Sequence, residues 1–127
     1  DIIDACIDKN LDKIEIKWKN LYACNIVLVS GGYPGNYEKG KIIKGIEEAE
    51  KQPDIIVFHA GTKVVRQDLT TKDLATNGGR VLGVSATGLT LKKALDAAYE
   101  AISKISFEGM YFRRDIGHKI LILHHKK

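Results

Sequence analysis

The chain has few of the residues that mark specialised protein classes. Its 127 residues include two cysteines, two prolines and one methionine, Met110. Two cysteines are too few for a disulfide scaffold, and both Cys6 and Cys24 lie in apolar runs, where free thiols are commonly buried. This cysteine usage favours a reducing compartment, and we expect the protein to be cytoplasmic.

Long hydrophobic runs are also missing. The longest candidates, residues 26–29 and 55–58, have the length of a strand, whereas a membrane-spanning helix needs roughly 20 apolar residues. Nothing resembles a signal or transit peptide, so we expect no membrane partner. The first residue is Asp1 instead of a start methionine, which predicts that the chain is processed or is a piece of a longer protein. We favour the second interpretation.

Charge of neither sign dominates. The chain has 20 Lys and Arg against 16 Asp and Glu, a net charge of +4, and the two signs are interspersed. This pattern favours an ordinary solvated surface, with a local anion site as the first alternative and a nucleic-acid-binding stripe as the second. No RNP-like aromatic motif and no zinc-finger spacing supports the nucleic-acid alternative, so we expect no nucleic-acid partner.

Hydrophobic periodicity predicts a small α+β domain with a largely antiparallel sheet of five or six strands and two helices. The longer helix covers residues 90–105, carries an apolar stripe and begins at Thr90, a suitable cap. The shorter helix covers residues 1–8 and precedes a strand-like or extended segment at residues 11–17. Residues 47–52 could add one or two helical turns. Strands are expected at residues 22–30, 41–46, 55–60, 63–66, 74–76 and 80–86.

Two connections between these strands have recognisable signals. The polar residues 67–73 predict an exposed loop. The Asn77-Gly78 dipeptide is the strongest hairpin-turn signal in the chain, and Gly79 could extend the turn or add a bulge.

A glycine-rich loop follows the first predicted buried strand. Residues 31–35 read Gly-Gly-Tyr-Pro-Gly, a composition that brings backbone N–H groups close to another group. Residues 35–41 also spell the G-x-x-x-x-G-K of a nucleotide-binding phosphate loop. However, Ile42 stands where that loop needs Ser or Thr for Mg²⁺, and the β-branched residues that follow disfavour the required helix. A tight turn without a ligand is one alternative, and a substrate-contacting loop of another fold is the one we favour.

A second candidate anion site lies near the C-terminus. Residues 113–118 read Arg-Arg-Asp-Ile-Gly-His and follow an aromatic run that we expect to be anchored in the core. Arginine forks match phosphate oxygens two at a time, so Arg113 and Arg114 are candidate phosphate ligands that Asp115 could orient. The alternative is a pair of solvated arginines.

Catalytic and metal-binding constellations are not evident. His59, His118, His124 and His125 lack metal-site spacing with one another or with cysteine, and we interpret His59 as a structural histidine. No Ser-His-Asp signature and no convincing pair of carboxylates is present. We therefore expect no catalytic residue and no metal ligand in this chain.

Five sequence blocks lie at residues 30–40, 58–62, 76–82, 107–109 and 113–117. In order and spacing they resemble the glycinamide ribonucleotide synthetase family. The resemblance covers residues 22–120, while residues 1–21 are similar to the end of that family's ATP-grasp domain, including its trailing short helix. It implies a C-terminal ligase domain over residues 22–127, with a small, mostly antiparallel sheet and one long packed helix. A longer and more polar stretch at residues 65–73 departs from the family and suggests an insertion.

The resemblance implies ATP-dependent ligation in de novo purine biosynthesis. The family joins 5-phosphoribosylamine and glycine to give glycinamide ribonucleotide, ADP and phosphate, through an acyl phosphate of glycine. ATP and its Mg²⁺ or Mn²⁺ are held mainly by upstream domains of the same polypeptide, so this chain alone is expected to be inactive. The alternative from another class is a non-catalytic anion- or nucleic-acid-binding domain.

The same resemblance implies that this chain contacts the phosphoribosyl group. Arg113 and Arg114 would hold the phosphate, and the loss of one arginine would weaken binding roughly 10- to 100-fold. The glycine loop would surround the ribosyl part. Its residues are Gly31, Gly32, Tyr33, Pro34 and Gly35.

Overall fold

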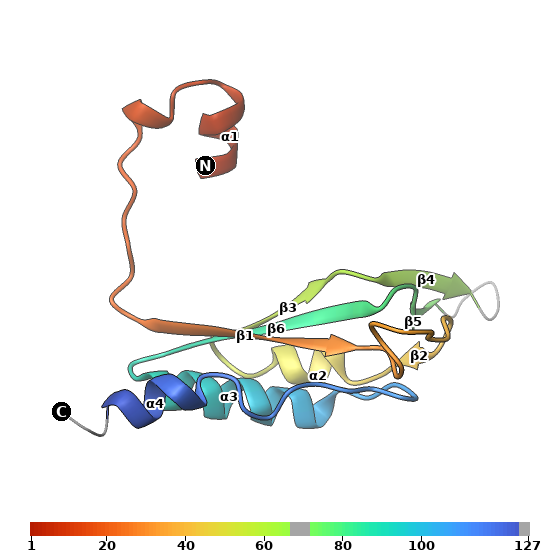
Figure 1. Cartoon of the computed structure of the whole chain (residues 1–127). Coiled ribbons are helices and arrows are strands. Elements are labelled where there is room, and N and C mark those ends of the chain that lie inside the picture. The colour runs from red at the N-terminus through yellow and green to blue at the C-terminus, as the bar shows by residue number, and fades with distance from the viewer. Residues whose placement is uncertain (67–71, 125–127) are drawn as a thin grey trace.

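Residues 1–66 and 72–124 are described by a computed structural model, and they form six strands, four α-helices and one short 3-10 helix (Figure 1). This architecture confirms the predicted α+β class. In chain order the elements are α1 (Ile2–Ile7), η1 (Leu11–Lys13), β1 (Tyr22–Val29), β2 (Ile42–Ile43), α2 (Ile46–Glu50), β3 (Ile55–His59), β4 (Thr62–Arg66), β5 (Lys72–Thr76), β6 (Arg80–Gly88), α3 (Leu91–Lys104) and α4 (His118–His124).

The strands form two antiparallel sheets, each three-stranded, in the orders β1-β6-β3 and β2-β5-β4. The predicted antiparallel pairing is confirmed. The predicted hairpin at Asn77-Gly78 is wrong, because β5 and β6 belong to different sheets and residues 77–79 carry the chain from one sheet to the other. Close packing explains the glycines here, since a Cβ on Gly61 would lie 3.0 Å from the Cα of Gly78.

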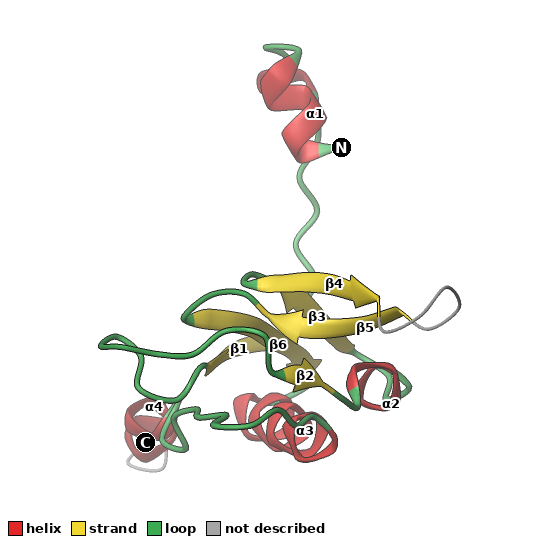
Figure 2. Cartoon of the chain, turned by 90° about the vertical axis from the view of Figure 1, so that its right-hand side faces the viewer, coloured by secondary structure: helices red, strands yellow, loops and turns green. Residues whose placement is uncertain are grey.

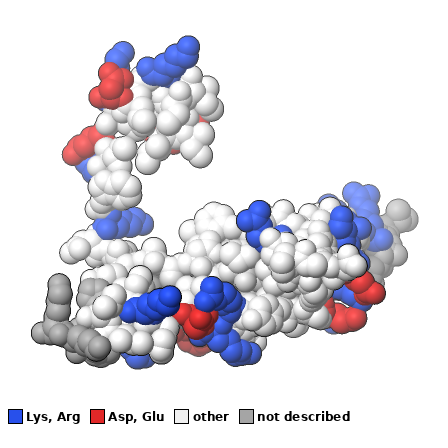
Figure 3. All heavy atoms as spheres, viewed as in Figure 1, with Lys and Arg blue, Asp and Glu red and all other residues white. Residues whose placement is uncertain are grey.

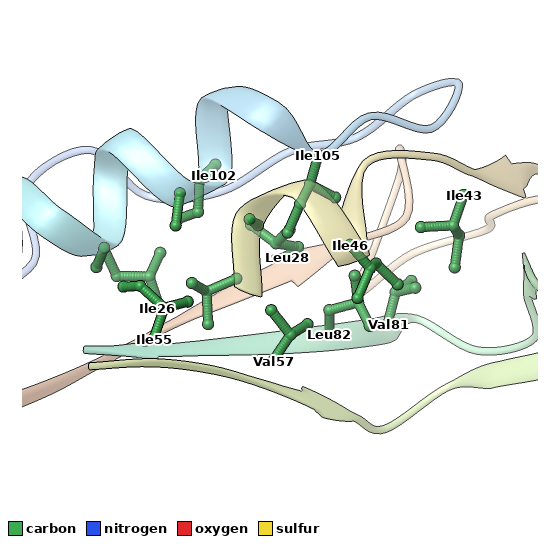
Figure 4. Packing of buried hydrophobic residues seen from close by; sticks show 14 of the residues in the cluster. Ile26, Leu28, Ile43, Ile46, Ile55, Val57, Val81, Leu82, Ile102 and Ile105 are labelled. Atoms are coloured by element: carbon green, nitrogen blue, oxygen red, sulfur yellow. The ribbon is translucent and has the colours of Figure 1, made fainter. Parts of the chain in front are cut away.

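Helices cover one face of the β1-β6-β3 sheet and form the core with it. Figure 2 shows α2, α3 and α4 on one side of the strands and α1 on the other. Ile26 and Leu28 of β1 and Val57 of β3 point toward the helices and belong to the same buried cluster as Ile102 of α3 (Figure 4). Full burial of each such side chain stabilises the fold by roughly 1.5–3 kcal/mol. Alanines on the buried face of α3 allow the helix to lie close to the sheet.

The long helix α3 agrees closely with the prediction. Its N-cap is Thr90, whose hydroxyl accepts a hydrogen bond from the backbone N–H of Lys93 at 3.2 Å. An exposed ion pair between Lys92 and Asp96, one turn apart, adds a small local stabilisation. No helix in the described ranges combines the length and apolar character needed to span a membrane.

The N-terminal segment lies apart from both sheets. Helix α1 forms where it was predicted, and Figure 1 shows it standing away from the rest of the chain. Its side chains Ile3 and Ile7 are 75% and 73% exposed. The prediction for residues 11–17 is wrong in its first part, because residues 11–13 form η1; extended backbone begins at Ile14.

Other boundaries differ from the predictions for local reasons. β2 is shorter than residues 41–46, because Gly45 adopts φ +85° and is the N-cap of α2, which begins at Ile46. β5 begins at Lys72, so the predicted loop at residues 67–73 overlaps a strand. Residues 67–71, which hold most of that loop and of the suggested insertion, lie outside the described residues. Helix α4 was not predicted.

Candidate functional site

The glycine loop begins where β1 ends and is held from two sides. The backbone N–H of Ser30 donates to the Gly79 carbonyl at 2.8 Å, and the Ser30 hydroxyl donates to the Gly78 carbonyl at 2.8 Å. On the other side, Val29 and Tyr111 exchange backbone hydrogen bonds of 2.9 and 3.0 Å. Three segments far apart in the sequence are thereby joined at one end of the β1-β6-β3 sheet.

Glycine is required in this region by close packing. A Cβ on Gly31 would lie 2.8 Å from the carbonyl oxygen of Gly109, and a Cβ on Gly79 would lie 2.1 Å from Cδ2 of Tyr33. Gly32 adopts φ +94°, which other L residues rarely do. The expected close backbone approach is therefore made by the chain on itself, and the Tyr33 ring rests on Gly79.

Two hollows open beside the Tyr33 ring. Both are lined by Asn25, Val27, Tyr33 and Arg80. The larger, about 620 Å³, extends over the face of the sheet that no helix covers, whereas the smaller, about 260 Å³, lies toward the C-terminal segment that contains Arg113. The glycine loop thus borders a surface with room for a small ligand.

Arg113 lies at the smaller hollow and is oriented by a carboxylate. Its Nε donates to Oδ1 of Asp115 at 2.9 Å and its Nη2 to Oδ2 at 2.7 Å, a bidentate pair. The hydrogen bond from Arg113 holds the pKa of the Asp115 carboxyl below its usual value. The Tyr99 hydroxyl donates to the Arg113 carbonyl at 2.9 Å and fixes the backbone. The expectation that Asp115 orients one arginine is confirmed.

Arg114 lies at a different hollow. Its guanidinium carbon is 4.9 Å from the centroid of the Phe112 ring, a cation–π contact. The side chain helps line a space of about 460 Å³ beside α3, together with Tyr99 and Ile102. The structure therefore brings Arg113, but not Arg114, to the surface beside Tyr33.

Sequence reasoning did not single out Arg80. This residue opens β6, directly after the segment on which the Tyr33 ring rests, and lines both hollows. Its position after Asn-Gly-Gly, a run that permits close backbone approach, is the signal that could have found it.

Lys41, the last residue of the phosphate-loop-like pattern, is already paired. Its Nζ lies 2.8 Å from Oε1 of Glu108 and 2.9 Å from Oε2 of Glu38. These hydrogen bonds, that of Glu108 first, raise the pKa of Lys41 above its usual value. Strand β2 follows in place of a helix. The rejection of a nucleotide-binding phosphate loop is confirmed, and Lys41 instead ties the loop to the C-terminal segment.

Metal coordination does not fit the described part of the chain. Across residues 1–66 and 72–124, no group of three or more His, Cys, Asp and Glu side chains is placed to hold a metal ion. His59 is exposed, and its Nδ1 lies 3.1 Å from the Thr62 hydroxyl.

Comparison with known proteins decides the family. Residues 23–119 match the family described as "Phosphoribosylglycinamide synthetase, C domain". The chain belongs to this family. The resemblance read from the five sequence blocks is thereby confirmed.

Named relatives agree with this family. The chain is 47% identical over 121 residues to a phosphoribosylamine–glycine ligase of Synechocystis, covering 94% of the chain and 27% of the relative. It is 43% identical to a bifunctional purine biosynthetic protein of Dictyostelium discoideum, covering 95% of the chain and 14% of the relative. The crystal structure of a phosphoribosylamine–glycine ligase from Thermotoga maritima matches with a TM-score of 0.66 and 33% identity, over 89% of the chain and 27% of that structure. The chain thus spans about a quarter or less of these proteins.

Proposed function

We propose that the chain is the C-terminal part of a phosphoribosylamine–glycine ligase and supplies contacts with the phosphoribosyl substrate. The family match over residues 23–119 is the observation that carries this proposal. The geometry supports it, because the glycine loop, the segment before β6 and the Arg113 segment meet at one end of the sheet beside two hollows. These segments come from the blocks that resemble the family.

The full-length protein would contain further domains, upstream of this chain, that carry out the phosphoryl transfer. We assign residues 1–21 to the end of an ATP-grasp domain and residues 22–127 to the C-terminal ligase domain. ATP and Mg²⁺ or Mn²⁺ would bind mainly to upstream domains. Those domains would transfer a phosphoryl group from ATP to glycine. The exposed Ile3 and Ile7 of α1 suit packing against those domains. The free Cys6 and Cys24 agree with a cytoplasmic protein.

At the site, Gly31, Gly32, Tyr33, Pro34 and Gly35 would shape the surface around the ribosyl group. Arg113 would bind the phosphate, exchanging its contact with Asp115 for one with phosphate oxygens. Arg114 stays a candidate for the same role, but its contact with Phe112 ranks it second.

Charge on the surface supports a small-molecule partner over a nucleic acid. Figure 3 shows Lys and Arg beside Asp and Glu on the face in view. Exposed ion pairs of the described residues include Lys51–Glu48 and Lys92–Asp96. Non-specific nucleic-acid binding depends on cations that remain free to contact phosphates.

The test is a ligation assay on the full-length protein with ATP, glycine and phosphoribosylamine generated from ribose 5-phosphate and ammonia. We expect glycinamide ribonucleotide, ADP and phosphate in equal amounts, and no product when any one substrate is omitted. An intact, folded protein that makes no product would refute the proposed function.

A further inference from the structure

We propose that Arg80 binds the phosphate of the phosphoribosyl substrate, together with Arg113, and is the stronger contributor of the two. This inference rests on the proposed function and extends it to a residue outside the glycine loop and the Arg113 segment. Three observations carry it: where Arg80 lies, how rigidly its backbone is held, and which charges surround it.

Arg80 stands between the two hollows. Among the described residues, it is the only charged side chain that lines both of them. Arg113 also lines the smaller hollow, so two arginines from distant segments border one space of about 260 Å³. A phosphate monoester has three oxygens that can accept from two such forks at once.

The backbone of Arg80 is fixed by close packing. Arg80 is the register partner of Val29, the last residue of β1. Its carbonyl oxygen would lie 2.5 Å from a Cβ on Gly61, so that neighbouring segment is also in contact with it. The preceding Gly79 lies under the Tyr33 ring. An arginine that leaves from so rigid a base loses less conformational freedom when it binds a ligand.

Arg113 and Arg80 differ in whether a carboxylate neutralises the charge of the side chain. Arg113 donates to Asp115 from both Nε and Nη2, at 2.9 and 2.7 Å, so a phosphate must compete with that carboxylate. In the described ranges, no carboxylate oxygen lies within 4.0 Å of an Arg80 guanidinium nitrogen. Arg80 therefore offers a positive charge that no carboxylate of those ranges already neutralises, which is the reason we expect it to contribute more.

The rest of the larger hollow suits the sugar that carries the phosphate. Val27, Gly83 and Phe58 are cross-strand neighbours and form a floor of low polarity. The Asn25 amide lies beside this floor, within 3.2 Å of where a Cβ on Gly83 would stand. A ribosyl ring can lie on such a floor while its hydroxyl groups exchange hydrogen bonds with the amide.

The experiment measures initial rates of the full-length ligase with Arg80→Ala and Arg80→Lys. The matched control is Arg66→Ala, which removes an exposed arginine from β4 in the other sheet. We expect Arg80→Ala to raise the KM for phosphoribosylamine roughly 10- to 100-fold, more than Arg113→Ala does. The KM values for ATP and glycine should stay near those of the unmodified enzyme, and Arg80→Lys should restore part of the affinity. Arg66→Ala should change none of the three constants.

Two results would overturn the inference. One is an unchanged KM for phosphoribosylamine in Arg80→Ala, and the other is a rise in the KM for ATP alone, which would assign Arg80 to a nucleotide phosphate. Calorimetric titration with ribose 5-phosphate, on variants whose thermal unfolding matches the parent, separates this inference from the proposed function. If the parent makes no product, the proposed function fails, and equal ribose 5-phosphate binding by the parent and Arg80→Ala would reject the role of Arg80 as well.

Discussion

The two faces of the β1-β6-β3 sheet are built by the same strands but carry different residue types. On the helix-covered face, Ile26, Val84 and Val57 are cross-strand neighbours, and all three are buried. In the next row, on the open face, β6 contributes Gly83 and its neighbours Val27 and Phe58 are 43% and 53% exposed. The covered face therefore stabilises the fold, and the open face has room for a ligand.

This difference shows how a small sheet can serve two purposes. Successive residues of a strand point to opposite faces, so a change at one position leaves the other face largely untouched. If the account is right, variants on the covered face alter stability, and variants around Tyr33 alter substrate affinity.

The largest effect should come from the covered face. Leu28 is 0% exposed, and Leu28→Ala should lower the free energy of unfolding by about 2–5 kcal/mol through lost burial and the cavity left behind. Val27→Ala, one residue along the strand on the open face, should cost less than about 1 kcal/mol. Urea unfolding of the two variants measures both losses in the free energy of unfolding. Equal losses would contradict the distinction between the faces.

Overpacking beneath the glycine loop should have the next largest effect. Gly79→Ala places a Cβ 2.1 Å from Cδ2 of Tyr33 and must displace the ring. We expect a loss of about 1–3 kcal/mol in the free energy of unfolding, together with weaker binding of phosphoribosylamine. The same substitution in a Tyr33→Ala background should lower the free energy of unfolding clearly less. A double-mutant cycle with additive costs would show that the ring does not rest on this glycine.

The adjacent arginines provide a comparison within the site. Arg113→Ala should raise the KM for phosphoribosylamine roughly tenfold, because it removes an arginine that lines the smaller hollow. Arg114→Ala should change that KM little, since the side chain lies over Phe112 at another hollow. Steady-state kinetics of the full-length variants decide between them. A larger effect at Arg114 would reverse the ranking.

The smallest expected effect is a shift in one titration. Because the hydrogen bond from Arg113 lowers the pKa of Asp115, its carboxyl should titrate below the ordinary 3.8. The pair then stabilises the fold above that pH, and the contribution disappears as pH falls through the lowered pKa. Carboxyl NMR shifts follow this titration. Arg113→Ala should move the midpoint upward, and an unmoved midpoint would rule out the pairing.

Much of the fold could be predicted because it depends on local patterns. The Thr90 cap and the apolar stripe fixed α3 within a residue at each end, and the strands that form the covered face follow runs of Ile, Val and Leu. The division into two sheets could not be predicted, since it depends on which distant strands pair. Asn77-Gly78 predicted a hairpin because the dipeptide fits one, whereas here its glycine serves packing against Gly61.

The candidate site was predicted in part for a similar reason. The glycine loop and the Arg113 segment are recognisable as sequence runs, and the structure joins them through Val29 and Tyr111. Which arginine faces that surface depends on side-chain direction, and adjacent arginines in a chain can point to separate hollows. Arg80 is distant from Arg113 in the sequence, so only the structure shows that both residues line one hollow.

The most direct test of the central claim is hydrogen–deuterium exchange of the full-length protein with and without ribose 5-phosphate. If the phosphoribosyl group binds where the glycine loop, the start of β6 and the Arg113 segment meet, exchange should slow in residues 30–37, 79–82 and 109–113. Slower exchange confined to residues 99–106, beside the hollow that contains Arg114, would contradict the account.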